Sequence, residues 1–169
     1  MTLGNNIILI GMPGAGKSTV GVILAKTLGM DFLDTDLAIC RRRGATLQSI
    51  LDTEGLESFL DLEENIVLSL RPENTVIATG GSVPLREQAM NHLKAGGRII
   101  YLDVPLEELR VTLSNIRTRG IAFGPGETLE TLFARRTPIY RNWADITIPT
   151  DPCRSDLEHT VEKIIAALK

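Results

Sequence analysis

A glycine-rich stretch near the beginning of the chain, GMPGAGKST at residues 11–19, constrains the fold more than any other feature of the sequence. It follows a short apolar run, NNIILI, that is typical of a buried strand. It precedes a segment, 17–28, whose apolar residues recur at helical spacing. A strand, a glycine-rich turn and a helix in this order direct several backbone N–H groups at one point beside the helix N-terminus. The stretch therefore predicts an anion-binding loop at the end of a strand.

The loop also matches the pattern G-x-x-x-x-G-K-[ST]. Its glycines let the backbone wrap around phosphate, its lysine reaches the β- and γ-phosphates, and its hydroxyl can bind Mg²⁺. The alternative, a glycine-rich turn with an incidental lysine, leaves the flanking strand and helix unexplained. We therefore expect bound ATP, with Mg²⁺. The residues expected to contact the nucleotide are Gly11, Gly14, Ala15, Gly16, Lys17, Ser18 and Thr19.

Strands and helices alternate along the remaining chain. We expect strands at 5–11, 31–36, 75–79, 98–104 and 145–150. We expect helices at 17–28, across 36–70 with breaks near Gly44 and Gly55, and at 84–95, 105–116, 128–141 and 155–168. This alternation predicts one α/β domain over residues 1–169, with helices on both faces of a mainly parallel sheet. Ligands of such sheets bind at the carboxyl ends of the strands.

The composition excludes several classes of function. A net charge of −3 gives no basic field for nucleic acid, and 43% hydrophobic with 23% charged residues is ordinary for a globular protein. No run of about 18 apolar residues predicts a membrane span, and no basic segment precedes IILIGM. We therefore expect a cytoplasmic protein without nucleic-acid or membrane partners. A chain of 169 residues leaves little room for motor machinery, which favours a kinase of a small molecule.

Two carboxylates, Asp34 and Asp36, end the second expected strand. If that strand continues through both residues, their side chains share one face. Asp34 could then hold Mg²⁺ together with Ser18, and Asp36 could orient the acceptor hydroxyl or accept its proton. The alternative for this stretch is helix capping by Thr35 or Asp36.

Two arginines carry the remaining candidate chemistry. Arg119 lies in RTRGIAFGPGE, a glycine-containing segment at 117–127 that could close over the nucleotide and exclude water. Arg136 lies in ARRTPIY. Guanidinium groups stabilise a transferring phosphoryl group or bind a carboxylate through two parallel bonds. The alternative, arginines on a solvated face, weighs more for Arg117 and Arg135.

Taken together, these residues resemble the shikimate kinase family along essentially the whole chain. The resemblance rests on GMPGAGKST, FLDTD, GLESFLDLEE, ATGGSV and ARRTPIYRNWAD, which occur in the family's order at compatible spacing. It implies a P-loop kinase fold with a five-stranded parallel sheet, a lid near 117–127 and substrate-binding helices across about 36–70. The activity it implies is ATP-dependent phosphorylation of the 3-hydroxyl of shikimate, in aromatic amino-acid biosynthesis.

The resemblance also implies roles for single residues. Lys17, Asp36 and Arg119 match catalytic residues, and Arg119 also reaches the nucleotide. Ser18 and Asp34 match the Mg²⁺ site. Asp36, Gly80, Gly81 and Arg136 match substrate-binding residues, and Glu63 matches a glutamate that supports the carboxylate site.

The chain departs from the family pattern at three places. Leu60 stands where an arginine for the substrate carboxylate is expected, Ser82 replaces the third glycine of a run, and RGIAFGPG replaces the lid sequence. Two alternatives stay open at this point. One is a kinase of the same architecture for another polyol, sugar acid or cyclitol, and the other is a non-catalytic nucleotide-binding homologue. We expect a monomer, because such compact kinases need no partner to complete the site.

Overall fold

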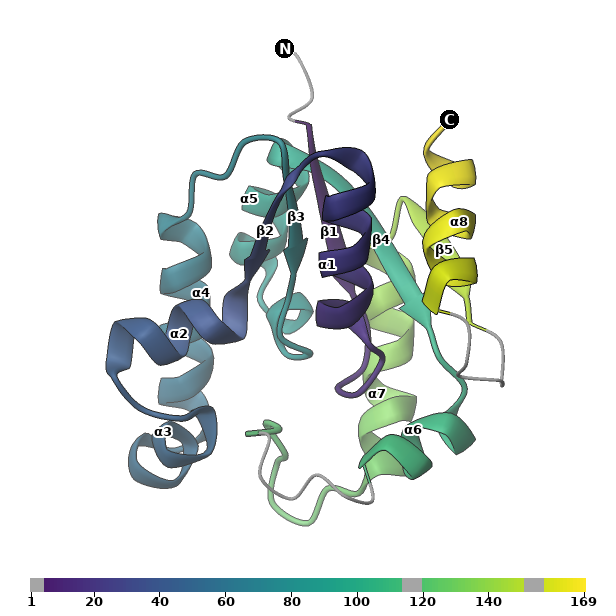
Figure 1. Ribbon diagram of the computed structural model, residues 1–169. Coiled ribbons are helices and arrows are strands. Elements are labelled where there is room, and N and C mark those ends of the chain that lie inside the picture. The colour runs from purple at the N-terminus through teal and green to yellow at the C-terminus, as the bar shows by residue number, and fades with distance from the viewer. Residues whose placement is uncertain (1–4, 114–119, 151–156) are drawn as a thin grey trace.

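The computed structural model, which describes residues 5–113, 120–150 and 157–169, contains five parallel strands in the order β2-β3-β1-β4-β5 (Figure 1). The strands are β1 (Asn6–Ile10), β2 (Asp31–Asp34), β3 (Thr75–Ala78), β4 (Gly97–Asp103) and β5 (Ile146–Pro149). The helices are α1 (Lys17–Leu28), α2 (Thr35–Arg43), α3 (Leu47–Glu54), α4 (Leu56–Ser69), the 3₁₀ turn η1 (Val83–Leu85), α5 (Glu87–Gly96), α6 (Leu106–Leu113), α7 (Leu129–Trp143) and α8 (Leu157–Leu168). This architecture confirms the predicted fold class.

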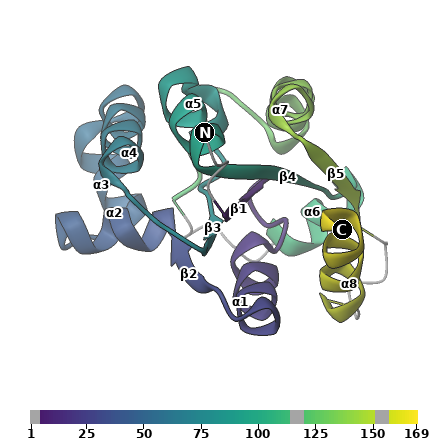
Figure 2. The same ribbon diagram turned by 90° about the horizontal axis from the view of Figure 1, so that it is seen from above.

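Helices cover both faces of the sheet, as the view from above shows (Figure 2). Strand β1 explains the arrangement, because its successive side chains point to opposite faces. Ile7 and Leu9 pack against α1 and α8, whereas Ile8 and Ile10 pack against α5 and α7. Because β1 lies at the centre, between β3 and β4, the loop that follows it opens where the strand order reverses.

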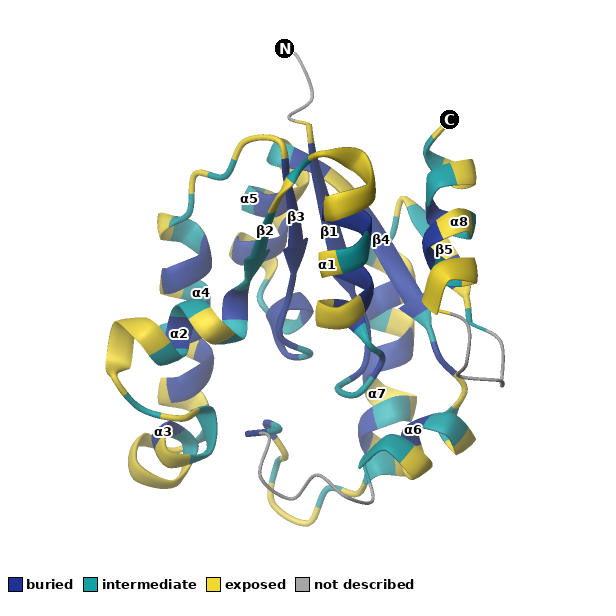
Figure 3. Cartoon of the chain, in the orientation of Figure 1, coloured by how far each residue is buried: buried dark blue, intermediate teal, exposed yellow. Residues whose placement is uncertain are grey.

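A third apolar cluster lies beyond the β2 edge of the sheet. It joins α2, α3 and α4 and comprises Ile39, Ile50, Phe59, Leu60, Ile66 and Ala122. Figure 3 shows buried positions on the inner sides of these helices and exposed positions on their outer sides. The breaks expected near Gly44 and Gly55 lie between α2 and α3 and between α3 and α4. The predicted division of residues 36–70 into helices is therefore confirmed.

Two expectations about local structure were wrong in detail. Strand β2 ends at Asp34, so it does not continue through Asp36. Instead, Oδ1 of Asp34 accepts hydrogen bonds from the backbone N–H groups of Asp36 and Leu37, which starts α2. The helix expected at 84–95 is divided at Arg86, which has an extended backbone between η1 and α5.

Within the described ranges, no helix is both long and apolar enough to cross a membrane.

Candidate active site

The loop after β1 has the geometry of a phosphate loop. Gly16 adopts a left-handed conformation, φ 85° and ψ 15°, as the residue that precedes α1. Such a conformation is inexpensive only for glycine. The Nζ atom of Lys17 donates hydrogen bonds of 2.8 Å to the carbonyl groups of Gly11 and Met12. The lysine is thereby held over the loop, with a third N–H left for a phosphate oxygen.

The ammonium of Lys17 is buried, and its environment sets its charge. Burial lowers the pKa of Lys17 to about 8, although Asp36 and Asp34 act in the opposite direction. At pH 7 the lysine is therefore still mainly protonated. A partly desolvated cation at this position attracts phosphate more strongly than an exposed one.

Ser18 and Asp34 meet at the end of β2. The Ser18 hydroxyl donates to Oδ2 of Asp34 at 2.5 Å, while Oδ1 of Asp34 caps α2. The capping alternative was thus wrong about the capping residue, and capping and site geometry use different oxygens of one carboxylate. A hydroxyl and a carboxylate are ligands that Mg²⁺ accepts, usually completed by phosphate and water.

Asp36 lies in the first turn of α2, beside Gly80 at the end of β3. Burial, together with the charge of Asp34, raises the pKa of Asp36 to about 6, while Lys17 opposes this shift. The backbone N–H of Gly80 donates to Oγ1 of Thr35, which fixes the end of β3 against α2. A carboxylate with a pKa near neutrality is suited to accept a proton.

Gly80 has no side chain where two carboxyl groups converge. A Cβ atom at this position would lie 2.6 Å from Oδ1 of Asp36 and 2.6 Å from Oε1 of Glu63. Both distances are shorter than real Cβ contacts allow, so only glycine lets these groups approach the β3 end. Glu63 comes from α4 and is 1% exposed, and its Oε2 accepts the Ser82 hydroxyl at 2.7 Å.

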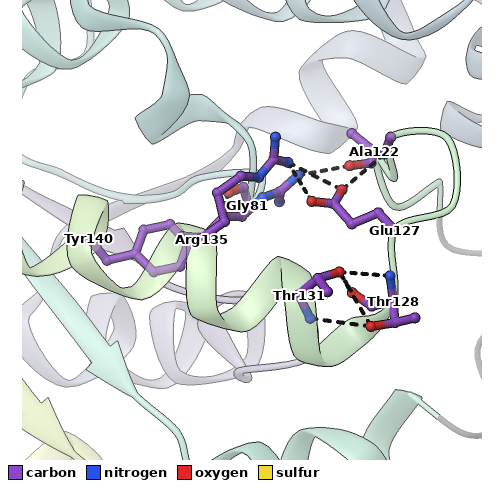
Figure 4. A network of polar contacts seen from close by, with 9 residues as sticks. Gly81, Ala122, Glu127, Thr128, Thr131, Arg135 and Tyr140 are labelled. Atoms are coloured by element: carbon purple, nitrogen blue, oxygen red, sulfur yellow. Dashed lines mark hydrogen bonds and ion pairs between the residues drawn. The ribbon is translucent and has the colours of Figure 1, made fainter.

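Arg136 is buried inside the fold and not on a solvated face. It is 1% exposed, and its Nη2 donates to the Ala122 carbonyl at 2.8 Å. One turn further along α7, the Tyr140 hydroxyl donates to the Gly81 carbonyl at 2.7 Å (Figure 4). Helix α7 therefore contacts both Ala122 and the glycine pair after β3.

One cavity gathers most of the predicted site residues. It is open to solvent, and its empty volume, including the solvent space at its mouth, is about 720 Å³. The predicted residues that line it are Gly14, Gly16, Lys17, Ser18, Thr19, Asp36, Glu63, Gly80, Gly81 and Arg136. Phosphate-loop residues and acceptor-side residues therefore face the same space.

Other predicted residues lie outside the lining. Gly11 and Ala15 belong to the phosphate loop but are buried, and Asp34 is connected to the site by its hydrogen bond with Ser18. Arg119, with Arg117, lies outside the described residues. Arg135 is 53% exposed in its side chain and pairs with Glu127 at 3.0 Å, so it belongs to the surface (Figure 4).

Sequence reasoning missed three residues that shape the site. Thr35 holds Gly80, Tyr140 holds Gly81, and Ser82 holds Glu63. Ser82 had been noted only as a departure from a glycine run. For Thr35 and Tyr140 the available signal was their place inside the motifs DTD and R-x-P-x-Y.

Comparison with known proteins identifies the group to which this site belongs. The sequence profile described as "Shikimate kinase" matches residues 13–169. The chain belongs to the shikimate kinase family. A shikimate kinase of Pasteurella multocida is 41% identical over 150 residues, 86% of either chain, and one of Pseudomonas aeruginosa is 38% identical over 164 residues, 94% of this chain and 95% of the other.

Solved structures agree with this family. A shikimate kinase from Acinetobacter baumannii, solved in complex with shikimate, superposes with a TM-score of 0.87 at 34% identity, over 99% of this chain and 93% of the other. The shikimate kinase of Aquifex aeolicus gives 0.82 at 32% identity, over 96% and 95% of the two chains. A member of this family is an ATP-dependent kinase of a hydroxyl group, so the enzyme class predicted from the phosphate loop is confirmed.

Proposed function

We propose that this shikimate kinase family member transfers the γ-phosphate of ATP to the 3-hydroxyl of shikimate. One observation supports this most strongly: Lys17 of the phosphate loop, Asp36 and Arg136 line a single cavity. Phosphoryl transfer needs a donor, an activated hydroxyl and a group that orients the acceptor, and these residues supply the three parts. Family membership favours this acceptor over the other polyols and over a non-catalytic role.

The donor end of the cavity is formed by the loop and α1. The backbone N–H groups between Gly14 and Thr19 would bind the phosphates, and Lys17 would contact the β- and γ-phosphates. Ser18 and Asp34 are the residues that would hold Mg²⁺, which neutralises phosphate charge when it is bound. Two oxygen ligands suit an ion that keeps water and phosphate in its remaining positions.

The acceptor end is formed by Asp36, Gly80, Gly81 and Arg136. Asp36 would accept a hydrogen bond from the hydroxyl that is phosphorylated, and its raised pKa allows it to take the proton during transfer. Arg136 would bind the carboxylate of shikimate, since a buried guanidinium forms strong charge-assisted bonds. Its Nε has no partner among the described residues.

Leu60 does not line this cavity. It is 8% exposed and packs in the apolar cluster with Phe59 and Ala122. The position of the expected second arginine is thus part of the core, and Arg136 carries the carboxylate contact from α7. We expect weaker binding of shikimate than two arginines would give, by about ten- to a hundredfold for one charge-assisted bond.

The finer assignments belong to this proposal as well. The whole chain acts as one kinase domain, with a lid at about 117–127 that carries Arg119 and with acceptor-binding helices across about 36–70. Within the described part of this lid, the cavity is lined by Gly120, Ile121 and Ala122. The active enzyme is a cytoplasmic monomer, which gel filtration and cell fractionation would test.

The deciding experiment is an ATP-consumption assay with shikimate among a panel of polyols, cyclitols and hydroxy acids. ADP release that depends on shikimate at micromolar to millimolar concentration supports the proposal. Turnover of another acceptor without turnover of shikimate would refute it, and ATP binding without turnover of any acceptor would indicate a non-catalytic protein. Omission of Mg²⁺ in the same assay tests the metal requirement.

A further inference from the structure

The cavity contains one carboxyl oxygen that the proposed function does not use. Oε1 of Glu63 has no hydrogen-bond partner in the described structure, although the residue is 1% exposed. Its other oxygen is held by Ser82, so the orientation of the carboxyl group is fixed. A buried polar atom without a partner is unfavourable, and a ligand group that pairs with it gains affinity.

This oxygen faces the proposed base. Oε1 of Glu63 and Oδ1 of Asp36 each lie 2.6 Å from the point where a Cβ of Gly80 would stand. The two oxygens are therefore no further apart than twice that distance. One hydroxyl oxygen lying above Gly80 can form a hydrogen bond of ordinary length to each of them.

We infer that Glu63 and Asp36 form a hydroxyl-binding subsite above Gly80, and that Glu63 is a specificity-determining residue for a second hydroxyl of the acceptor. Ser82 is its positioning residue. The inference rests on the proposed function, because it takes the acceptor to bind in this cavity. It adds a requirement: the acceptor must carry another hydroxyl beside the one that is phosphorylated.

The direction of the two hydrogen bonds follows from charge. Two carboxyl groups this close do not both ionise readily. Burial, together with the charge of Asp36, raises the pKa of Glu63 to about 8. At neutral pH Glu63 is therefore protonated and donates a hydrogen bond to the bound hydroxyl, which in turn donates a hydrogen bond to Asp36.

Other polar and charged groups around Glu63 also shift its pKa. Ser82, Arg136 and Arg86 lower its pKa, and among the described residues Lys17 on α1 also interacts electrostatically with Glu63. Arg86 is already paired with Glu57 and Asp61 on the outer side of α4.

Leu60 explains why the carboxyl group is free to act in this way. It lies three residues before Glu63 on α4 and packs in the apolar cluster. An arginine there would be a neighbour of Glu63 on the helix and would stabilise its ionised form. With leucine at this position, the hydroxyl of Ser82 is the group that binds the carboxyl directly.

The test compares two acceptors in three enzymes. The acceptors are shikimate and an analogue in which the hydroxyl next to the phosphorylated one is replaced by hydrogen. The enzymes are the unmodified chain, Glu63→Gln and Glu63→Met. We expect the unmodified enzyme to prefer shikimate by about tenfold or more in kcat/KM, mainly through KM. Glu63→Gln keeps a donor and this preference, whereas Glu63→Met loses it.

The dependence on pH gives a readout that a merely structural role would not change. The preference of the unmodified enzyme declines as pH rises through about 8, because Glu63 then loses the proton it donates. Glu63→Gln shows no such decline. Ser82→Ala moves this decline to higher pH and raises the KM for shikimate, because Ser82 lowers the pKa of Glu63 and orients its carboxyl group. Ser82→Thr restores the pH of the decline and the KM. Ser69→Ala, at a serine outside the cavity, changes neither the pH of the decline nor the KM.

Two results overturn the inference: an equal preference in Glu63→Met and in the unmodified enzyme, or an alkaline decline that persists in Glu63→Gln. If shikimate is not turned over, the proposed function fails by itself. The subsite is then tested with the panel acceptor that is turned over and its deoxy analogue. If no acceptor is turned over, both proposals fail.

Discussion

Gly80→Ala is the most direct test of the position of the acceptor. Gly80 does not have a positive φ, so alanine fits its backbone and only the added methyl group acts. The methyl carbon would lie 2.6 Å from the carboxyl oxygens of Asp36 and Glu63. Asp36 can rotate away, but Glu63 is buried and held by Ser82. The substitution therefore fills the space where the acceptor hydroxyl binds and displaces the proposed base.

The magnitude follows from the bonds that are lost. A hydrogen bond between a hydroxyl and a charged group contributes about 1.5–3 kcal/mol, so loss of one such bond lowers kcat/KM by about ten- to a hundredfold. Loss of the base position lowers kcat as well. The phosphate loop is not touched by the methyl group, so the affinity for ATP should not change.

The assay measures kcat and KM for shikimate, the dissociation constant of ATP, and the melting temperature. Gly96→Ala is the matched control, because its Cβ would lie 3.4 Å from Nδ2 of Asn6, which is an ordinary contact at the end of α5. We expect unchanged kinetics for that variant. A Gly80→Ala enzyme that folds, binds ATP and keeps the KM of the unmodified enzyme would refute an acceptor above Gly80.

Four further outcomes are expected. Asp36→Asn should abolish transfer while ATP still binds, which isothermal titration can show; unchanged turnover would remove Asp36 from the mechanism. Leu60→Arg should lower KM for shikimate about tenfold but reduce the melting temperature, since a guanidinium enters an apolar cluster, and no gain in KM would show a rebuilt acceptor pocket. Tyr140→Phe should destabilise the fold by about 0.5–1.5 kcal/mol in denaturant titration, because the partly buried Gly81 carbonyl loses its partner. Glu63 binds a proton in the folded state between pH 4.5 and about 8 that the unfolded chain releases, so its contribution to the free energy of unfolding falls as pH rises through this window. Glu63→Gln should remove that decline.

Several helix ends and the phosphate loop could be predicted from the local sequence alone. Helix α1 begins and ends where the glycines at 16 and 29 predict, because both residues adopt left-handed conformations that stop regular structure. The phosphate loop could also be predicted, because its geometry depends on residues that are neighbours in the chain. The division of the region 36–70 into three helices likewise follows from Gly44 and Gly55.

The end of β2 shows where such reasoning failed. Period-two alternation places Asp34 and Asp36 on one face of a strand, but a hydrogen bond from the backbone of Asp36 to the Asp34 side chain starts a helix instead. Strand continuation and helix capping differ by a few hydrogen bonds. The choice between them depends on packing against β3 and α4 as well as on the local residues.

The sequence by itself determined that this chain binds a nucleoside triphosphate on an α/β sheet and that it resembles the shikimate kinases. Only the tertiary structure decided what surrounds the acceptor. Glu63 on α4, Asp36 on α2 and Gly80 after β3 are distant in sequence, and they meet because parallel strands and their crossover helices bring their ends to one edge of the sheet. The same packing buries Leu60 in an apolar cluster and pairs Ser82 with Glu63, contacts that no local pattern of residues encodes.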